Sequence, residues 1–339
     1  TAVWLLFLMW MAVTTIFAIF PEYSLVQLIK VSKIQLFALL ALLLMGSRER
    51  INKLIWVIVI SLSYFGVKGG LFTIVHGGSF IVWGPPGSFI EGNNELALAI
   101  LMVIPLMNYL REITENKWIK RGLLIGMLLM GVSSLGSQSR GALLAGGAML
   151  MYFWTKSKNK MIGGVVALIF SIALVTFMPE SWHKRMDTIE TYEEDASAMG
   201  RINAWEAALN LAKDRFMGGG YDGINVLKVF QLYAPNPLDY HDAHSIYFEV
   251  LGDHGFIGLM LFFLTGLLAW LMSSGVIRKT KGISELSEFN ILARMLQVSL
   301  LAYAIGGTFL GLAYFDLYYH LIVLVILCRY LVDEHLNAN

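Results

Sequence analysis

The sequence has little charge and almost no cysteine. Only 14% of its 339 residues are Asp, Glu, Lys or Arg, and 57% are hydrophobic, whereas soluble domains of this length carry about 25% charge. This deficit excludes an ordinary soluble domain and indicates an integral membrane protein. The single cysteine, Cys328, excludes a disulfide within the chain and any chemistry that needs a cysteine pair. The near-zero net charge gives no sign of nucleic-acid binding.

The sequence also lacks internal repeats with periods of about 20–50 residues and low-complexity tracts. No basic segment precedes the first apolar run, which starts next to Thr1. We therefore expect a chain trimmed at its N-terminus and not a secretory signal peptide.

Long apolar runs fill most of the chain. A bilayer core of about 30 Å needs roughly 20 apolar residues in a helix, and a segment facing lipid must satisfy its backbone groups internally. The sequence therefore predicts an all-α polytopic membrane protein with about ten visible transmembrane helices. They are expected at residues 2–20, 28–46, 54–76, 94–110, 119–136, 141–155, 161–178, 244–275, 291–312 and 315–332.

The connections between these spans alternate in charge. Lys and Arg gather in the connections 47–53, 111–121, 155–160 and 278–290. The short connections near 21–27, 77–93 and 313–316 contain neither. By the positive-inside rule the first set is cytoplasmic, and the second set faces outward together with one long polar segment. The predicted organisation is N-terminal transmembrane helices (1–178), a large periplasmic loop (179–243) and C-terminal transmembrane helices (244–339), forming one membrane domain.

The long loop contains an amphipathic helix. In the stretch 201–212 one helical face is expected to carry Ile202, Trp205, Ala208, Leu209 and Ala212. The helix is expected to stop near residues 218–220, three glycines that permit positive φ angles and a tight turn. Three arginines accompany it in the loop, namely Arg185, Arg201 and Arg215.

Several basic residues lie in the outward half, where few are expected. Lys30 and Lys33 lie in the outer part of the second span, and Lys68 lies in the outer half of the third. A charge inside a span costs about 2.5 kcal/mol or more, so each needs a partner or a function; snorkelling to the interface is the alternative. Arg140 occupies a very short turn, Ser137–Gly141. We favour anion binding there, because the planar guanidinium suits a phosphate.

His244 stands where the next span begins. The amide groups at a helix start attract phosphate and disfavour a protonated imidazole, so a neutral histidine there is suited to accept a proton from a hydroxyl. Its alternative role is capping or packing. Glu249, five residues on, does not share a face with His244; it either orients a polar network or pairs with a buried lysine.

A metal site is the competing interpretation of this region. Asp239, His241, Asp242 and His244 could form a cluster, but the run straddles a helix start and lacks a convincing remote ligand. We therefore expect no metal and no other cofactor.

Taken together, these motifs resemble the O-antigen ligase and polymerase superfamily, and most of all the O-glycosylation ligases associated with exosortase systems. The resemblance runs from about residue 75 to 320, and the order of the motifs around one outward loop is more specific than any single motif. The motifs are Gly92-Asn93-Asn94-Glu95, Ser139-Arg140-Gly141, the stretch from Trp182 to Met186, Gly200-Arg201 with Trp205, the Gly218–Gly220 turn, and His244-Ser245 with Glu249, Gly255 and Gly258.

The resemblance implies a GT-C-like, metal-independent, inverting glycosyltransferase in the bacterial inner membrane, with its active site facing the periplasm. Family members often have about twelve helices, which agrees with a trimmed N-terminus. The donor is a glycan on undecaprenyl diphosphate and the acceptor is a hydroxyl, most simply of lipid A–core; membrane lipids are further partners. Carried over, Arg140 and Arg201 bind the diphosphate and His244 is the general base.

The other outward basic residues extend this candidate site. Lys33, Lys68, Arg185 and Arg215 are grouped with the donor-binding residues, and His241 and Glu249 with the supporting ones. One departure from the family pattern weakens the assignment of Arg215 to donor binding. The residues Asp214-Arg215-Phe216-Met217 stand where the family commonly has an Asn-Pro turn.

Three alternatives stay open. A polymerase of the same superfamily joins two lipid-linked glycans, and a protein O-oligosaccharyltransferase uses a serine or threonine acceptor. A transporter of lipid-linked glycans would carry charges at mid-membrane and inverted repeats, whereas the charges here gather at the outer ends.

Overall fold

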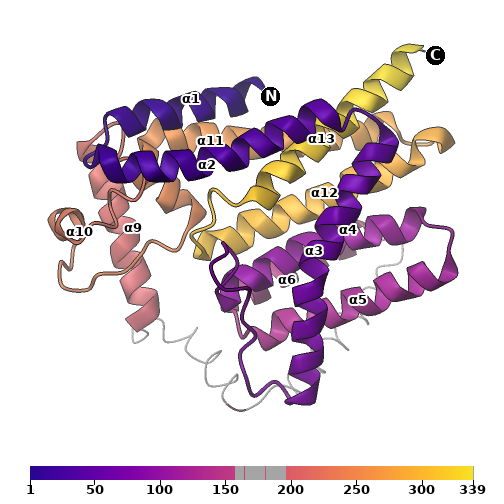
Figure 1. Ribbon diagram of the computed structural model, residues 1–339, viewed down its shortest axis with the longest axis horizontal. Coiled ribbons are helices and arrows are strands. Elements are labelled where there is room, and N and C mark those ends of the chain that lie inside the picture. Colours follow the sequence, from indigo (N-terminus) through magenta and orange to yellow (C-terminus); the bar gives the residue numbers. More distant parts are fainter. Residues whose placement is uncertain (157–163, 165–179, 181–195, 339) are drawn as a thin grey trace. The chain divides into compact units, whose positions relative to one another are not determined.

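The computed structural model describes residues 1–156, 164, 180 and 196–338 (Figure 1). Every regular element in these ranges is a helix, which confirms the all-α class. The predicted span 161–178 and Arg185 lie outside the described residues. The chain divides into two compact units. The first comprises Thr1–Ala41, Thr188–Leu271 and Gly307–Ile326, and the second comprises Leu42–Asp187, Met272–Gly306 and Leu327–Asn339.

Six described helices are long and apolar enough to cross a membrane, so the chain is a polytopic membrane protein. They correspond to six of the ten predicted spans; the total of ten, or of twelve in a longer chain, stays a prediction. The six are α2 (Pro21–Leu44), α3 (Arg48–Val75), α4 (Asn93–Ile113), α5 (Lys117–Gly136), α11 (Ile246–Lys279) and the segment Ser284–Phe309 that contains α12 (Ser287–Gly306). Three further predicted spans coincide with α1 (Ala2–Ile16), α6 (Arg140–Lys156) and α13 (Asp316–Ala338).

The start of α2 corrects one predicted boundary. The connection was expected near 21–27, but α1 ends at Ile16 and α2 begins at Pro21. Proline favours the first position of a helix, because its φ is already helical and it has no N–H to leave unpaired. As a result Lys30 and Lys33 lie near the middle of α2, not in its outer part.

The first unit is held together by contacts between distant parts of the chain. The indole of Trp4 stacks on Tyr319, with ring centroids 6.1 Å apart, and donates to Oε1 of Gln35 at 2.9 Å. A second core forms between α9 (Ala196–Asp214) and α10 (Leu227–Tyr233). These contacts join segments from both ends of the chain into one unit.

The buried face of α9 agrees with the predicted one in part, because Ala208 and Ala212 are buried as expected. Ala204, Ala207 and Leu211 are buried against α10 and the segments beside it, whereas Ile202 and Leu209 are only half-buried. Four of the five apolar residues buried on this helix between 204 and 212 are alanines, whose small side chains let two helices approach closely.

Helix α11 is broken near its start. Gly255 has φ 65° and ψ −169°, which only glycine adopts readily, and the segments on either side are separate helices. The break presents carbonyl groups to outside donors: the amide of Gly219 donates to Gly252 at 2.8 Å, and that of Gly220 donates to Asp253 at 2.9 Å. Gly218 and Gly220 have φ values of 71° and 79°, which confirms the predicted glycine turn.

The second unit packs around α4. Residues Leu96–Val103 of this helix are all buried, with α3, α5, α6 and α12 against it, as expected of a helix that is apolar on every side. At one end of the unit the buried carboxylate of Glu288 accepts hydrogen bonds from Asn52 at 2.8 Å and Tyr109 at 2.6 Å, and pairs with Arg48. This network ties α3, α4 and α12 together.

Candidate functional site

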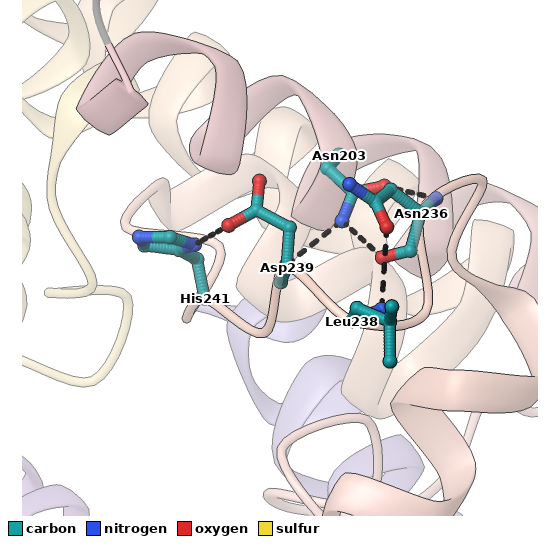
Figure 2. A network of polar contacts seen from close by, with 5 residues as sticks. All are labelled: Asn203, Asn236, Leu238, Asp239 and His241. Atoms are coloured by element: carbon teal, nitrogen blue, oxygen red, sulfur yellow. Dashed lines mark hydrogen bonds and ion pairs between the residues drawn. The ribbon is translucent and has the colours of Figure 1, made fainter.

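The segment between α10 and α11 carries both candidate histidines, and α9 holds it in place. The side-chain amide of Asn203 on α9 donates to the carbonyls of Asn236 and Asp239, each at 2.9 Å. Its oxygen accepts from the backbone N–H of Asn236 at 2.9 Å (Figure 2). The side chain of Asn236 then accepts from Leu238 at 3.3 Å. One asparagine thus fixes the turn that leads into His241.

His241 lies against the start of α9. A Cβ atom added at Gly200 would come within 2.4 Å of Nδ1 of His241, so only glycine allows the imidazole this close. The same nitrogen lies 3.0 Å from Oδ1 of Asp239 (Figure 2). Arg201, the next residue along α9, is half-buried. The structure therefore explains the glycine of the Gly200-Arg201 motif: without a side chain at position 200, His241 can pack against the helical turn that carries Arg201.

Trp205 makes the third contact between α9 and this segment. Its indole N–H donates to the carbonyl of Ala243 at 2.6 Å, and its ring stacks on Phe248 with centroids 5.0 Å apart. The contact fixes the residue directly before His244. The predicted motif Gly200-Arg201 with Trp205 is therefore one continuous support for the histidine segment.

His244 does not begin a helix, contrary to the prediction. Helix α11 begins at Ile246, and His244 has a φ of 40°, in the left-handed region. The carbonyl of Ser245 accepts the first helical bond, from Glu249 at 2.8 Å, so His244 lies one residue ahead of the helix cap. It is half-exposed, as is Asp242, whose Oδ2 lies 4.0 Å from Nδ1 of His244. The imidazole is therefore open to a substrate and close to a carboxylate.

Neighbouring Tyr240 is not suited to accept a proton at neutral pH. Its hydroxyl donates to the carbonyl of Asn225 at 2.6 Å. Burial raises the pKa of Tyr240, and the carboxylates of Asp242 and Asp222 raise it further. The phenol of Tyr240 therefore stays neutral at this pH.

Glu249 and Asp253 on α11 fasten the connection before α13. Oε2 of Glu249 accepts from the backbone N–H of Ala313 at 3.0 Å, and Oδ2 of Asp253 accepts from the hydroxyl of Tyr314 at 2.8 Å. Glu249 therefore orients a polar network, one of its two predicted roles. Asp253 was missed, although its spacing of four residues from Glu249 places both on one helical face.

Arg215 lies where the glycine turn begins. Its Nε donates to the carbonyl of Gly218 at 3.3 Å, and its Nη2 donates to the carbonyl of Phe17 at 2.9 Å. This geometry favours a structural role, in line with the departure from the family pattern. Lys33 is exposed near the middle of α2 and Lys68 is exposed on α3; donor binding by these lysines stays a prediction.

Arg140 belongs to the second unit, as the first residue of α6. The preceding residues 137–139 form the predicted short turn and are buried. Oγ of Ser139 caps α6 by accepting from the N–H of Ala142 at 3.1 Å, and Asn93 donates to the carbonyl of Ser137 at 2.8 Å. Two motifs of the resemblance, at 92–95 and 139–141, thus meet beside a half-buried arginine at a helix start.

The acidic and histidine residues before α11 form two pairs, Asp239 with His241 and Asp242 with His244. Among the described residues, no group of three His, Cys, Asp or Glu side chains is arranged to hold a metal ion. The prediction of a reaction without metal remains untested.

Comparison with known families accounts for two segments of the chain. Residues 125–263 match a family model described as O-Antigen ligase. Residues 1–115 match a family of unknown function, DUF5935. No curated protein matches the chain. The first match contains Arg140, Arg201, His241, His244 and Glu249.

Proposed function

Because the chain belongs to the O-antigen ligase superfamily, we propose that it transfers a glycan from undecaprenyl diphosphate to an acceptor hydroxyl, most simply on lipid A–core. At the coarser level the chain is a membrane enzyme of the O-antigen ligase or polymerase type. The reaction would occur at the periplasmic face of the bacterial inner membrane. The observation that carries the proposal is the support of the His241–His244 segment by the arginine-bearing start of α9.

In this mechanism His244 is the general base. The acceptor oxygen attacks the anomeric carbon while its proton passes to the imidazole, and the bond from that carbon to the diphosphate breaks. The electron pair leaves with the diphosphate, and the anomeric centre is inverted in one step. Asp242, at 4.0 Å, would stabilise the imidazolium that forms.

The arginines would act on the leaving group. Arg201 and Arg140 would stabilise the charge that grows on the diphosphate, an effect worth about 3 kcal/mol for each preorganised donor. His241 and Glu249 would keep the segment and the connection at 313–314 in place. Lys33, Lys68 and Arg185 remain candidates for the donor's outer phosphate, and Arg215 is a weaker one.

The test uses the purified protein with an undecaprenyl-diphosphate glycan and lipid A–core, and follows glycan-bearing lipid by gel shift. We expect His244→Ala to lower kcat by about 10²- to 10⁴-fold while donor binding changes little. His76→Ala is the matched control, because His76 is an exposed histidine of the second unit. Near-normal transfer by His244→Ala would refute the base assignment.

Arg201→Ala and Arg140→Ala should each lower transfer by about 10²-fold or more and weaken donor binding. Arg50→Ala, at an exposed arginine that bonds to the carbonyl of Leu44, is the control. The products also separate the alternatives. Lengthening of the lipid-linked glycan itself would identify a polymerase, and glycan on a protein acceptor would identify a protein glycosyltransferase.

A further inference from the structure

A second candidate ligand site lies in the second unit, at the end of α6 opposite Arg140. A cavity of about 750 Å³ opens between α6, the end of α11 and α12, a size typical of ligand sites. It is lined by Tyr152, Phe153, Lys156, Ser274, Ile277, Arg278, Lys281, Arg294, Met295, Gln297 and Val298. Sixteen residues of helix separate Lys156 from Arg140, about 24 Å at 1.5 Å per residue. The cavity is therefore distinct from the diphosphate-binding position proposed for Arg140.

Among the described residues, the charged side chains that line the cavity are all basic. Lys156, Arg278 and Lys281 are exposed at its edge, and none of the described residues that line it is Asp or Glu. Neighbouring Lys279 behaves differently, because its Nζ lies 2.6 Å from Oδ1 of Asp333. Basic residues near these helix ends are expected from the positive-inside rule. The rule explains why basic residues are frequent here. It does not explain why several of them surround one cavity whose described lining contains no Asp or Glu.

Arg294 supplies the observation that the rule does not cover. It is the eighth residue of α12, half-buried, and lines the same cavity. Its Nε donates to Oδ1 of Asn290 at 2.8 Å, which holds the guanidinium in one orientation. A cation set within a membrane helix is costly, and marks a position where an anion or water is received.

The remaining lining is amphipathic. The hydroxyl of Tyr152 donates to Oε1 of Gln297 at 2.7 Å, and Nε2 of Gln297 donates to Oγ of Ser274 at 2.7 Å. Beside this polar chain lie the apolar side chains of Phe153, Ile277 and Met295. A ligand that fits must present a phosphate to the cations and hydrocarbon to the apolar wall.

We propose that this cavity binds the headgroup of an anionic phospholipid. Basic pockets between membrane helices commonly receive such headgroups. The lipid phosphate would lie among Lys156, Arg278, Lys281 and Arg294, with the upper acyl chain along the apolar wall. A soluble phosphate compound matches the charge, but it leaves the apolar wall unused.

The test measures lipid binding by native mass spectrometry of the detergent-solubilised protein, titrated with phosphatidylglycerol or phosphatidylcholine. We expect one phosphatidylglycerol to bind more tightly than the rest, with phosphatidylcholine much weaker. Arg294→Gln should lower the affinity for that tightly bound lipid about five-fold. The triple variant Lys156→Gln/Arg278→Gln/Lys281→Gln should lower it about 100-fold. Arg294→Lys should fall between wild type and Arg294→Gln, because it keeps the charge but loses the fork.

The matched control removes the same charge from the start of α5, as Lys117→Gln/Lys120→Gln/Arg121→Gln, and should leave this binding unchanged. Melting temperatures in detergent verify that each variant is folded. Equal weakening by both triple variants would show that only general surface charge attracts the lipid, and would overturn the proposal. Displacement of the lipid by glycerol phosphate at similar concentration would also overturn it, because the site would then recognise a free phosphate.

Discussion

Arg140 and His244 stand at similar places in the chain but are held in different ways. Each follows a short turn and lies at or just before the start of a long helix. The turn before Arg140 is buried, and its own Ser139 caps α6. Asn93 donates to the carbonyl of Ser137 from 44 residues away, and Gln138 donates to the carbonyl of Gly78, 60 residues away. The segment before His244 depends on α9, through Gly200, Asn203 and Trp205. The turn before Arg140 thus combines a local helix cap with bonds to two distant segments, whereas the segment before His244 is held by three residues of one helix.

The helices that follow these two residues also differ, because α11 is broken at Gly255. The largest expected effect on stability comes from comparing a glycine substitution in α11 with one in α6. In α11, Gly255→Ala would place a Cβ 2.1 Å from the carbonyl oxygen of Phe216 at a φ of 65°. The strain alone costs about 1–3 kcal/mol, and the backbone clash adds to it. In α6, Gly147 has nothing within 4 Å. We expect Gly255→Ala to lower the melting temperature sharply in detergent and Gly147→Ala to leave it unchanged or raise it; equal effects would contradict the break in α11.

A second pair compares the two asparagines. Asn203→Ala removes three hydrogen bonds to the 236–239 turn, whereas Asn93→Ala removes one, to Ser137. At about 1 kcal/mol for each net bond, Asn203→Ala should cost about 2–3 kcal/mol and Asn93→Ala about 1 kcal/mol. Denaturant titration of the detergent-solubilised variants measures both. If Asn93→Ala proved the more costly, the idea that α9 is the main support of the histidine segment would fail.

The smallest expected difference concerns one hydrogen bond in each region. Trp205→Phe keeps an aromatic ring against Phe248 but loses the donor to Ala243. Ser139→Ala loses the cap of α6. Each should cost about 1 kcal/mol of stability. Transfer assays should distinguish them, because Trp205→Phe loosens the residue beside the proposed base; we expect the larger fall in kcat there.

Hydropathy and local turn chemistry predicted much of the fold. Six predicted spans coincide with helices able to cross a membrane, and the positive φ angles at Gly218 and Gly220 follow from glycine itself. Helical periodicity predicted the inward face of α9 only in part: Ala208 and Ala212 are buried as expected, whereas Ile202 and Leu209 are half-buried. Its alanines are buried because α10 approaches closely, and that approach is set by residues distant in sequence.

The candidate site shows the same limit. A short turn next to Arg140 was predicted correctly, although α6 already begins at Arg140. The bonds that tie the turn to Asn93 and Gly78 were not predicted. The start of α11 was placed two residues early, because the left-handed backbone at His244 depends on contacts made by the residue before it. Asp253 was overlooked because its partner, Tyr314, lies 61 residues away.

The composition of the first unit has a consequence for how the protein is made. The first unit contains both Thr1–Ala41 and Gly307–Ile326. The rings of Trp4 and Tyr319 can therefore stack only after Tyr319 has been synthesised and has left the ribosome. At about 5–20 residues per second, the 315 residues from Leu5 to Tyr319 (319 − 4) take roughly 15 to 60 seconds to translate. During that interval α1 and α2 lack the segment that completes their core. Assembly of the histidine-bearing unit is therefore a late event in biosynthesis, and nascent chains arrested before residue 307 should contain no complete first unit.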